Sequence, residues 1–175
     1  MKQLATTFVT TMLAATMLHA QGANPISDHL KGQWTNIRDV LTRMAEKMPE
    51  ENYRFKPTAE MQDFGQRMAH VAGFNLRTCS MVSGQAKMPM VSNAPTKAEV
   101  TALVKEANTA CDAVFNTLTD AEAMKMIPAG RGAMRPKFAV LEGNVLEHSQ
   151  EVYGYMAPYL RLKGIIPPSS DRNER

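Results

Sequence analysis

The sequence predicts an all-α protein, a four-helix bundle preceded by an N-terminal signal peptide. Four segments carry apolar residues at alternating spacings of three and four, which is typical of amphipathic helices. Sustained period-two alternation with β-branched residues, which would indicate strands, is nearly absent. A chain of 175 residues is long enough for one packed domain, or at most two small ones.

The first twenty residues have the composition of a secretory signal peptide. Lys2 precedes an apolar, threonine-rich run over residues 4–18, which is shorter than a membrane span, and Ala20 supplies a small residue at the cleavage site. The alternative is a first core helix, but threonines are poor helix formers and no charge occurs between Lys2 and Asp28. We therefore assign residues 1–20 to a signal peptide and expect an exported protein, periplasmic or secreted.

The charge balance limits the classes of partner. The chain has 20 basic and 17 acidic residues, a formal net charge of +3, which does not indicate a basic surface for nucleic acid. It has no run of about 18 apolar residues that could span a bilayer, so we expect no membrane association after the signal peptide is cleaved. A small-molecule ligand and a homodimer are compatible with the sequence.

The first helix is predicted soon after the signal peptide. Ser27 or Asp28 can cap its N-terminus, and Pro49 ends it, because proline cannot continue a helix. Its apolar stripe consists of Leu30, Trp34, Ile37, Leu41, Met44 and Met48. These residues lie on one face of a helix and predict a single side buried in the core.

The second and third helices each begin with the spacing of a capping box. Asp63 precedes Gln66 by three residues in the second helix, which Gly84 ends. Thr96 precedes Glu99 by three residues in the third. The stripe of the second helix consists of Phe64, Met68, Val71, Cys79 and Val82. The stripe of the third consists of Val100, Leu103, Ala107, Cys111, Val114 and Leu118.

The fourth helix is predicted after Pro136. Its apolar stripe consists of Phe138, Leu141, Val145, His148, Val152, Tyr155 and Tyr159. Beyond it, residues 167–175 are rich in proline, serine and charge, and we expect this tail to be flexible. The folded domain is therefore expected over residues 21–166.

The two cysteines predict the order of the helices. Cys79 and Cys111 each lie about 20 Å from the start of their helices, at a rise of about 1.5 Å per residue. They can meet if the second and third helices run parallel, and residues 85–95 are long enough for the crossover that this requires. We infer a disulfide, as expected in an oxidising compartment, and an up-down-down-up bundle. Two buried free thiols are the alternative.

Three histidines follow the signal peptide, and two of them are candidate ligands. His29 lies at the entrance of the first helix and is expected to be a solvated surface residue. His148 falls within the stripe of the fourth helix, and His70 lies at the margin of the second. A lone histidine in a stripe is more often a hydrogen-bonded core residue, but facing histidines on two helices can build a metal site in a bundle. Two ligands are too few for a tight zinc site.

Three segments carry a resemblance to a known family. Residues 48–57 are MPEENYRFKP, residues 64–73 contain FG followed by AHVAG, and residues 153–170 are YGYMAPYLRLKGIIPPSS. The chain resembles exported members of the DinB-like superfamily. The resemblance implies an up-down-down-up bundle that holds a divalent metal, often zinc or nickel, with one histidine on the second helix and an H-x-x-x-H pair on the fourth. Characterised members include thiol-dependent S-transferases and isomerases.

The chain departs from this pattern at one position. His70 matches the ligand of the second helix and His148 the first of the fourth-helix pair, but Val152 occupies the place of the third histidine. Asn144 and Glu151 are conceivable substitutes, and Glu151 is chemically better, because two histidines and a glutamate form a workable zinc set. The predicted metal ligands are therefore His70, His148 and Glu151. The alternative is a degenerate site whose histidines pair through water or a carboxylate.

Methionine is abundant, with 14 residues in the chain, and four of them form M-x-M pairs. Met88 with Met90 and Met124 with Met126 both lie outside the main stripes. Such thioether pairs can bind Cu(I) in an exported protein, whereas the alternative is that methionine fills irregular gaps between helices and loops.

Taken together, these patterns give one functional hypothesis and two alternatives. We expect an exported DinB-like protein that is a metal-dependent enzyme, of hydrolase or thiol S-transferase type, with an incomplete set of histidines. A non-catalytic periplasmic binding or structural bundle is the first alternative. A methionine-based copper-binding protein is the second.

Overall fold

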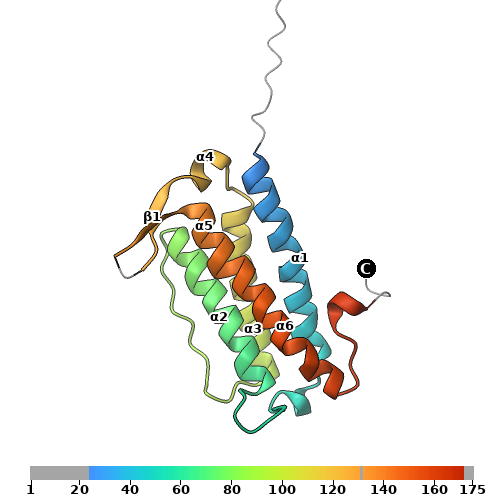
Figure 1. Ribbon diagram of the computed structural model, residues 1–175. Helices are drawn as coiled ribbons and strands as arrows, with labels where there is room; N and C mark the ends of the chain where they lie inside the picture. Colours follow the sequence, from blue (N-terminus) through green and yellow to red (C-terminus); the bar gives the residue numbers. More distant parts are fainter. Residues whose placement is uncertain (1–23, 131, 172–175) are drawn as a thin grey trace, which may run out of the picture.

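Four long helical segments run side by side in the computed structural model, which describes residues 24–130 and 132–171 (Figure 1). The expected signal peptide, residues 1–20, lies outside the described residues. The first three segments are α1 (Pro25–Lys47), α2 (Phe64–Val82) and α3 (Lys97–Phe115). The fourth is continuous but composite, and consists of α5 (Lys137–Leu141), the π-helical η2 (Glu142–Glu147) and α6 (His148–Leu162).

Short elements join or follow these helices. They are η1 (Glu50–Asn52), α4 (Asp120–Ala123), β1 (Met126–Pro128), β2 (Met134–Pro136) and η3 (Pro168–Ser170). Strands β1 and β2 form an antiparallel hairpin, so the prediction of an all-α fold was wrong in this detail and the fold is mostly helical. Each strand has three residues and ends in proline, which is too short for a period-two pattern to be visible in the sequence.

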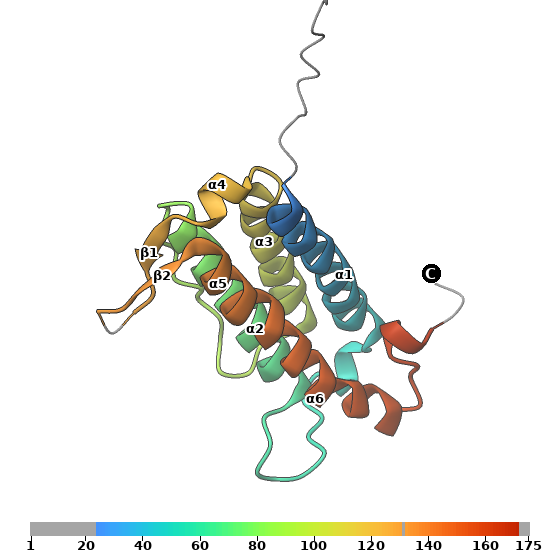
Figure 2. The ribbon, with the colours of Figure 1, turned by 45° about the horizontal axis from the view of Figure 1, so that its top comes forward.

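The helix directions follow from contacts between their ends. The Lys97 ammonium at the start of α3 donates to the carbonyl of Met48 just after α1. The Gln66 side chain at the start of α2 donates to the carbonyl of Asn93, close to the start of α3. The Tyr159 hydroxyl near the end of α6 donates to a carbonyl just before α2. Helices α2 and α3 are therefore parallel to one another and antiparallel to α1 and α6 (Figures 1 and 2).

The capping boxes predicted for α2 and α3 are both confirmed. The Asp63 side chain accepts a hydrogen bond from the backbone N–H of Gln66, whose own side chain accepts one from the backbone of Asp63. Thr96 and Glu99 make the same reciprocal pair in α3. Gly84 follows α2 at a φ of +76°, a left-handed conformation that glycine adopts without strain.

Helix α1 is capped from a distant part of the chain instead of by the predicted Ser27 or Asp28 side chain. The helix begins at Pro25, and the Asp120 carboxylate at the start of α4 accepts hydrogen bonds from the N–H groups of Ile26 and Ser27 and from the Ser27 hydroxyl. A carboxylate is favourable here, because the first turn of a helix presents unpaired N–H donors and a partial positive charge.

The buried face of the fourth segment agrees with the predicted stripe at Val152 and Tyr159 but differs from it at other positions past the π-helical turn. Past the π-helical turn the buried residues are Ser149, Val152, Met156, Tyr159 and Leu160. His148 is at the margin of this face and Tyr155 is exposed, although both were placed in the core stripe by their spacing. A π turn holds more residues than an α turn and so moves the face that follows it.

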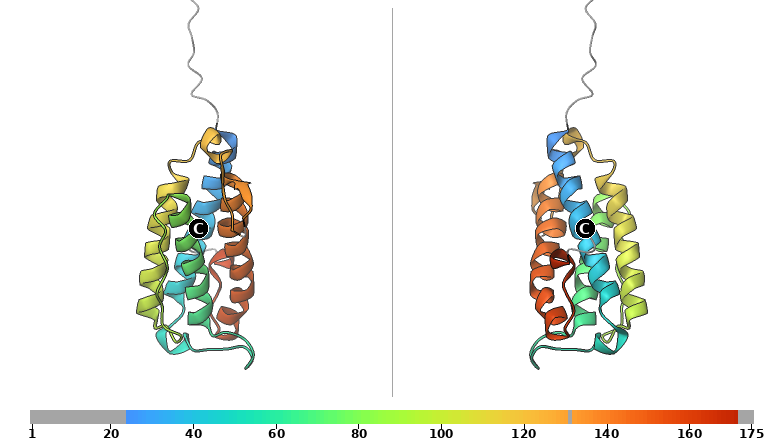
Figure 3. Two further views of the ribbon diagram at one scale, coloured as in Figure 1. Left: turned by 90° about the vertical axis from the view of Figure 1, so that its left-hand side faces the viewer. Right: turned by 90° about the vertical axis from the view of Figure 1, so that its right-hand side faces the viewer.

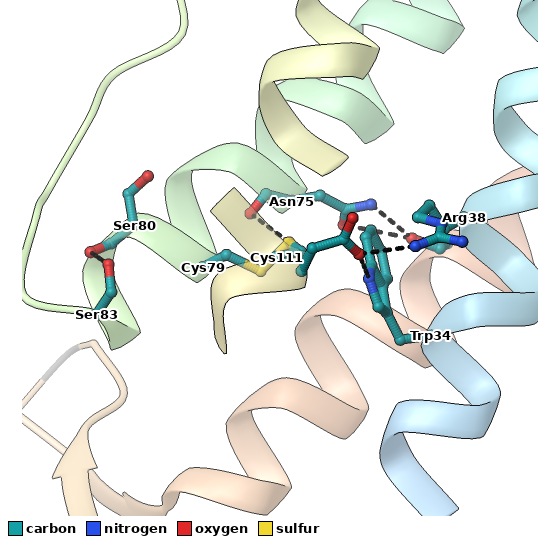
Figure 4. Close-up of a disulfide and its surroundings, with 9 residues drawn as sticks. Trp34, Arg38, Asn75, Cys79, Ser80, Ser83 and Cys111 are labelled. Carbon is teal, nitrogen blue, oxygen red and sulfur yellow. Dashed lines mark hydrogen bonds and ion pairs between the residues drawn. A yellow bond between two sulfur atoms is a disulfide. The ribbon is translucent and has the colours of Figure 1, made fainter. Parts of the chain in front are cut away.

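The disulfide joins Cys79 of α2 to Cys111 of α3, as predicted, with their Cα atoms 5.1 Å apart (Figure 4). Both residues are fully buried. One turn before Cys79, the Asn75 side chain donates to the Ser149 hydroxyl, a buried hydrogen bond of 2.9 Å that ties α2 to α6. On the α1 side lies Trp34, which also belongs to the core.

The closing stretch packs on the bundle as far as residue 171, although the sequence predicted a flexible tail from residue 167. Pro168 is buried, and Tyr153 and Ser169 are joined through their hydroxyls at 2.7 Å. Lys47 at the end of α1 pairs with Asp171, so this stretch lies beside α1 (Figure 3). Within the described part of the chain, no helix is both long and apolar enough to cross a membrane.

Removal of the disulfide tests how much it stabilises the parallel packing of α2 and α3. The bond closes a loop of 32 residues, which in the chain-entropy model contributes about 3–4 kcal/mol. The double substitution Cys79→Ala and Cys111→Ala should therefore lower the free energy of unfolding by about this amount in urea titrations. The native protein, denatured without reductant, should give no titratable thiol. Two thiols, or an unchanged free energy of unfolding, would contradict the assignment.

Candidate functional site

Two histidines from α2 and α6 face each other between these antiparallel helices. The Nε2 atoms of His70 and His148 are 3.1 Å apart, and the rings are nearly perpendicular, with centroids at 5.1 Å. Two of the predicted ligands, 78 residues apart in the sequence, are thus brought together by the up-down-down-up order. His70 lies on the exposed side of α2, in agreement with its place at the margin of the predicted stripe.

Glu151, the third predicted ligand, lies at the other nitrogen of His148. Its Oε2 atom is 3.7 Å from His148 Nδ1, whereas His70 meets the Nε2 atom of the same ring. Tyr155 donates a hydrogen bond of 2.6 Å to the second oxygen of the carboxylate. This bond, followed by the interaction with His148, lowers the pKa of Glu151, so the group is a carboxylate at neutral pH.

This arrangement favours one tautomer of His148. A carboxylate beside Nδ1 stabilises the proton on that nitrogen, which leaves a lone pair on Nε2 directed at His70. A ligating histidine is commonly oriented in this way by a carboxylate on its distal nitrogen. Glu151 therefore lies where it can orient His148, and not on the side where the two Nε2 atoms meet.

The surroundings of His70 keep its imidazole neutral. Burial against the neighbouring side chains lowers its pKa, and the charges of His148, Arg67 and Arg77 lower it further. Arg67, His70, Phe74 and Arg77 follow one another at spacings of three and four, so they form a stripe on α2 beside the core stripe. The Arg77 guanidinium lies over the Phe74 ring, 4.8 Å from its centroid.

Two open hollows meet at Phe74, one on each side of the histidine pair. A cavity of about 340 Å³ contains His70, Phe74 and Arg77 together with Met88 and Pro89 of the crossover. A second cavity, of about 440 Å³, is lined by Phe74, Gly143, Asn144, Glu147, His148 and Glu151. A larger hollow of about 530 Å³ lies between α1 and α3 and contains neither histidine.

Glycine at position 73 brings the crossover onto α2 beside His70. A Cβ atom at this position would lie 3.0 Å from Pro89 Cγ, closer than side chains tolerate without a shift. This contact accounts for the position of Met88 and Pro89 in the wall of the cavity. Sequence reasoning missed Arg67, Phe74 and Arg77, although their helical spacing from His70 is a signal that could have found them.

The spacing of the two Nε2 atoms matches two ligands of one divalent metal, and it also matches a direct hydrogen bond between the rings. In a tetrahedral site with bonds of about 2.0–2.1 Å, two ligating nitrogens lie about 3.3 Å apart, close to the distance between the two Nε2 atoms. Val152 is 1% exposed in the core, and its aliphatic side chain has no donor atom for a metal. Among the residues described, no group of three or more His, Cys, Asp or Glu side chains is arranged to hold a metal.

The protein is a mostly helical bundle in which a pair of histidines lies between the second and fourth long helical segments. The family model of the DinB superfamily matches residues 33–150, so the chain belongs to this superfamily. None of the curated proteins matches the chain at a significant level.

Two solved DinB-like proteins have a similar fold. One, from Bacillus subtilis, has a TM-score of 0.64 and 20% identity over 82% of this chain and 99% of its own. Another, from Bacillus cereus, has a TM-score of 0.67 and 16% identity over 81% of this chain and 95% of its own. At these identities the likeness concerns the fold alone.

The lowered pKa of His70 predicts a measurable pH dependence in the metal-free protein. An NMR titration should place the His70 midpoint below the ordinary value of about 6.5, and His148→Gln should raise it by removing one of the causes. As the pH falls, the unfolded chain is protonated at His70 before the folded protein is. The contribution of His70 to stability is therefore fully present above pH 6.5 and is lost as the pH falls through the pKa of the folded state. Thermal melts of His70→Gln should lose less stability than wild type over this range. A His70 midpoint above 6.5 would contradict the prediction.

Proposed function

We propose that the protein is an exported metal-dependent enzyme that holds one zinc or nickel ion through His70 and His148. The observation that carries the proposal is the approach of the two Nε2 atoms to 3.1 Å, with a carboxylate behind one ring. Hydrolysis or thiol transfer on a small molecule is the class of reaction that we assign to it. The remaining positions around such an ion would be open to ligands from solution.

Each neighbour of the pair has a part in this proposal. Glu151 Oε2, 3.7 Å from His148 Nδ1, favours a proton on that nitrogen, and the Tyr155 hydroxyl donates to the other oxygen of the carboxylate. Burial and the charge of Arg67 keep His70 unprotonated, so its lone pair is available near neutral pH. When bound, a divalent metal supplies a Lewis acid that can activate water or a thiol.

The two hollows beside the histidines offer room for a small substrate. Phe74 forms the apolar surface common to both. Arg77 borders one hollow and Glu147 the other, so the site presents opposite charges at its two sides. A small molecule with polar or charged groups on both sides of an apolar centre is the class of substrate that these surfaces would accept.

A non-catalytic bundle is the second candidate, and the burial of Val152 favours it. At this position the third nitrogen donor expected from the family resemblance is replaced by an apolar side chain of the core. The His70 and His148 rings would then be a hydrogen-bonded pair, with His70 donating to the free Nε2 of His148. Metal binding distinguishes the two candidates.

Metal titration of protein purified without a histidine tag tests the proposal. Calorimetry with Zn²⁺ and Ni²⁺ should give one site per chain that is abolished by His70→Ala and by His148→Ala. Glu151→Gln should weaken it by about 10–100-fold, because it removes the group that orients His148. Val152→His should strengthen binding by at least about tenfold, because it adds a third imidazole one turn beyond His148.

Glu147→Gln is the matched control for Glu151→Gln. Glu147 lies on the same segment and lines the same hollow, but Glu151 is the carboxylate that faces His148 Nδ1. The control should change the affinity by less than about twofold, and circular dichroism should show that each variant keeps its helical content. A wild-type protein that binds neither ion, or binds both equally well without His70 and His148, would refute the proposal and favour the non-catalytic bundle.

A further inference from the structure

Methionine accounts for most of the large apolar side chains that the described residues leave exposed. Six of these ten side chains are methionines, namely Met81, Met88, Met90, Met124, Met126 and Met134. A methionine that fills a gap in the core would be buried, so gap filling does not explain these six. Three of them gather at the β1–β2 hairpin, an element that the sequence did not reveal.

The register of the hairpin places two thioethers on one face. Met126 is paired with Pro136, and Met134 is paired with Pro128. Because side chains alternate along a strand and paired residues share a face, Met126 and Met134 lie on the same side. They are diagonal neighbours, at about 7–8 Å between Cα atoms, which is within reach of two long side chains.

Met124 supplies a third thioether close by in the chain. It follows α4 and precedes Met126 by two residues, so their Cα atoms are at most about 7 Å apart. Met124, Met126 and Met134 are 54%, 55% and 53% exposed, respectively. Each can turn its sulfur atom towards a common point, since methionine has three rotatable bonds and none of the three is locked in a core.

The charges near this face are partly paired and remain net positive. Lys125 and Lys137 both pair with the Glu122 carboxylate, which offsets part of their charge. Arg135 is paired with Ile127, and both point to the opposite face of the hairpin from Met126. The face of the hairpin that carries Met126 and Met134 therefore presents soft, uncharged donors, and the Arg135 guanidinium points to the other face.

We propose that Met124, Met126 and Met134 form a binding site for one Cu(I) ion. Thioether sulfur is a soft donor that selects Cu(I) over zinc, nickel and the hard cations. The site is independent of the histidine pair, from which it differs in both position and donor chemistry. It gives the exposed methionines of the hairpin a role that packing does not.

The other M-x-M pair lacks this arrangement and serves as a control. Met88 and Met90 are 74% and 95% exposed, and both lie in the extended crossover between α2 and α3. Met88 lines the hollow beside His70, and among the described residues no strand pairs with this segment to bring a further thioether to it. The two pairs have the same spacing in the sequence. A difference in Cu(I) affinity between their variants would therefore be caused by the hairpin.

Anaerobic titration of Cu(I) against a chromophoric Cu(I) chelator tests the site. The wild-type protein should take up one equivalent. The double variant Met126→Leu and Met134→Leu should lower the affinity by at least about tenfold, because it removes two of three soft donors while conserving volume. The double variant Met88→Leu and Met90→Leu should stay within about twofold of wild type.

A second measurement locates the ion directly. With methyl-labelled methionine, Ag(I), a redox-inert substitute for Cu(I), should shift the methyl signals of Met124, Met126 and Met134 and leave those of Met88 and Met90 unchanged. Equal losses of Cu(I) affinity in both double variants, an unchanged Cu(I) affinity in the hairpin variant, or loss of Cu(I) binding in His70→Ala would each overturn the assignment. Zn²⁺ and Ni²⁺ binding should be the same in wild type and the hairpin variant.

Discussion

The parallel pairing of α2 and α3 is the constraint on which the rest of the structure depends. Adjacent helices joined by a short loop would run antiparallel, so this pair requires the long crossover and is fastened by the Cys79–Cys111 disulfide. Helix α3 packs on one face of α2, and α6 packs antiparallel on another face of the same helix. His70 and His148 meet because of this order, although they are 78 residues apart.

Local signals in the sequence predicted the long helices well. The two capping boxes, the glycine after α2 and the matched depths of the cysteines each depend on residues close together or on simple helical geometry. The hairpin and the capping of α1 by Asp120 could not be predicted in this way. Asp120 lies more than 90 residues from the helix that it caps, and strands of three residues carry no periodic pattern.

The sequence brought His70, His148 and Glu151 forward as candidates but did not specify how their side chains meet. Helical spacing places Glu151 beside His148, but it does not specify which ring nitrogen the carboxylate meets. In the structure Glu151 lies beside Nδ1 of His148 and away from the Nε2 atom that meets His70. Val152 occupies the position at which the family resemblance implies a third histidine, and it is buried in the core. One face of a helix can hold both core positions and site positions. Helical spacing alone is therefore a weak predictor of metal ligands.

The π-helical turn Glu142–Glu147 lies between α5 and α6 and changes the direction in which side chains point around the helix axis. One surplus residue in a turn changes the angular phase of everything beyond it by about 100°. The π-helical turn therefore fixes the rotation between the side of α5 that packs near the hairpin and the side of α6 that carries His148. Changes in length at this turn would act as a rotation of the histidine about the helix axis, with the core contacts of α5 left in place.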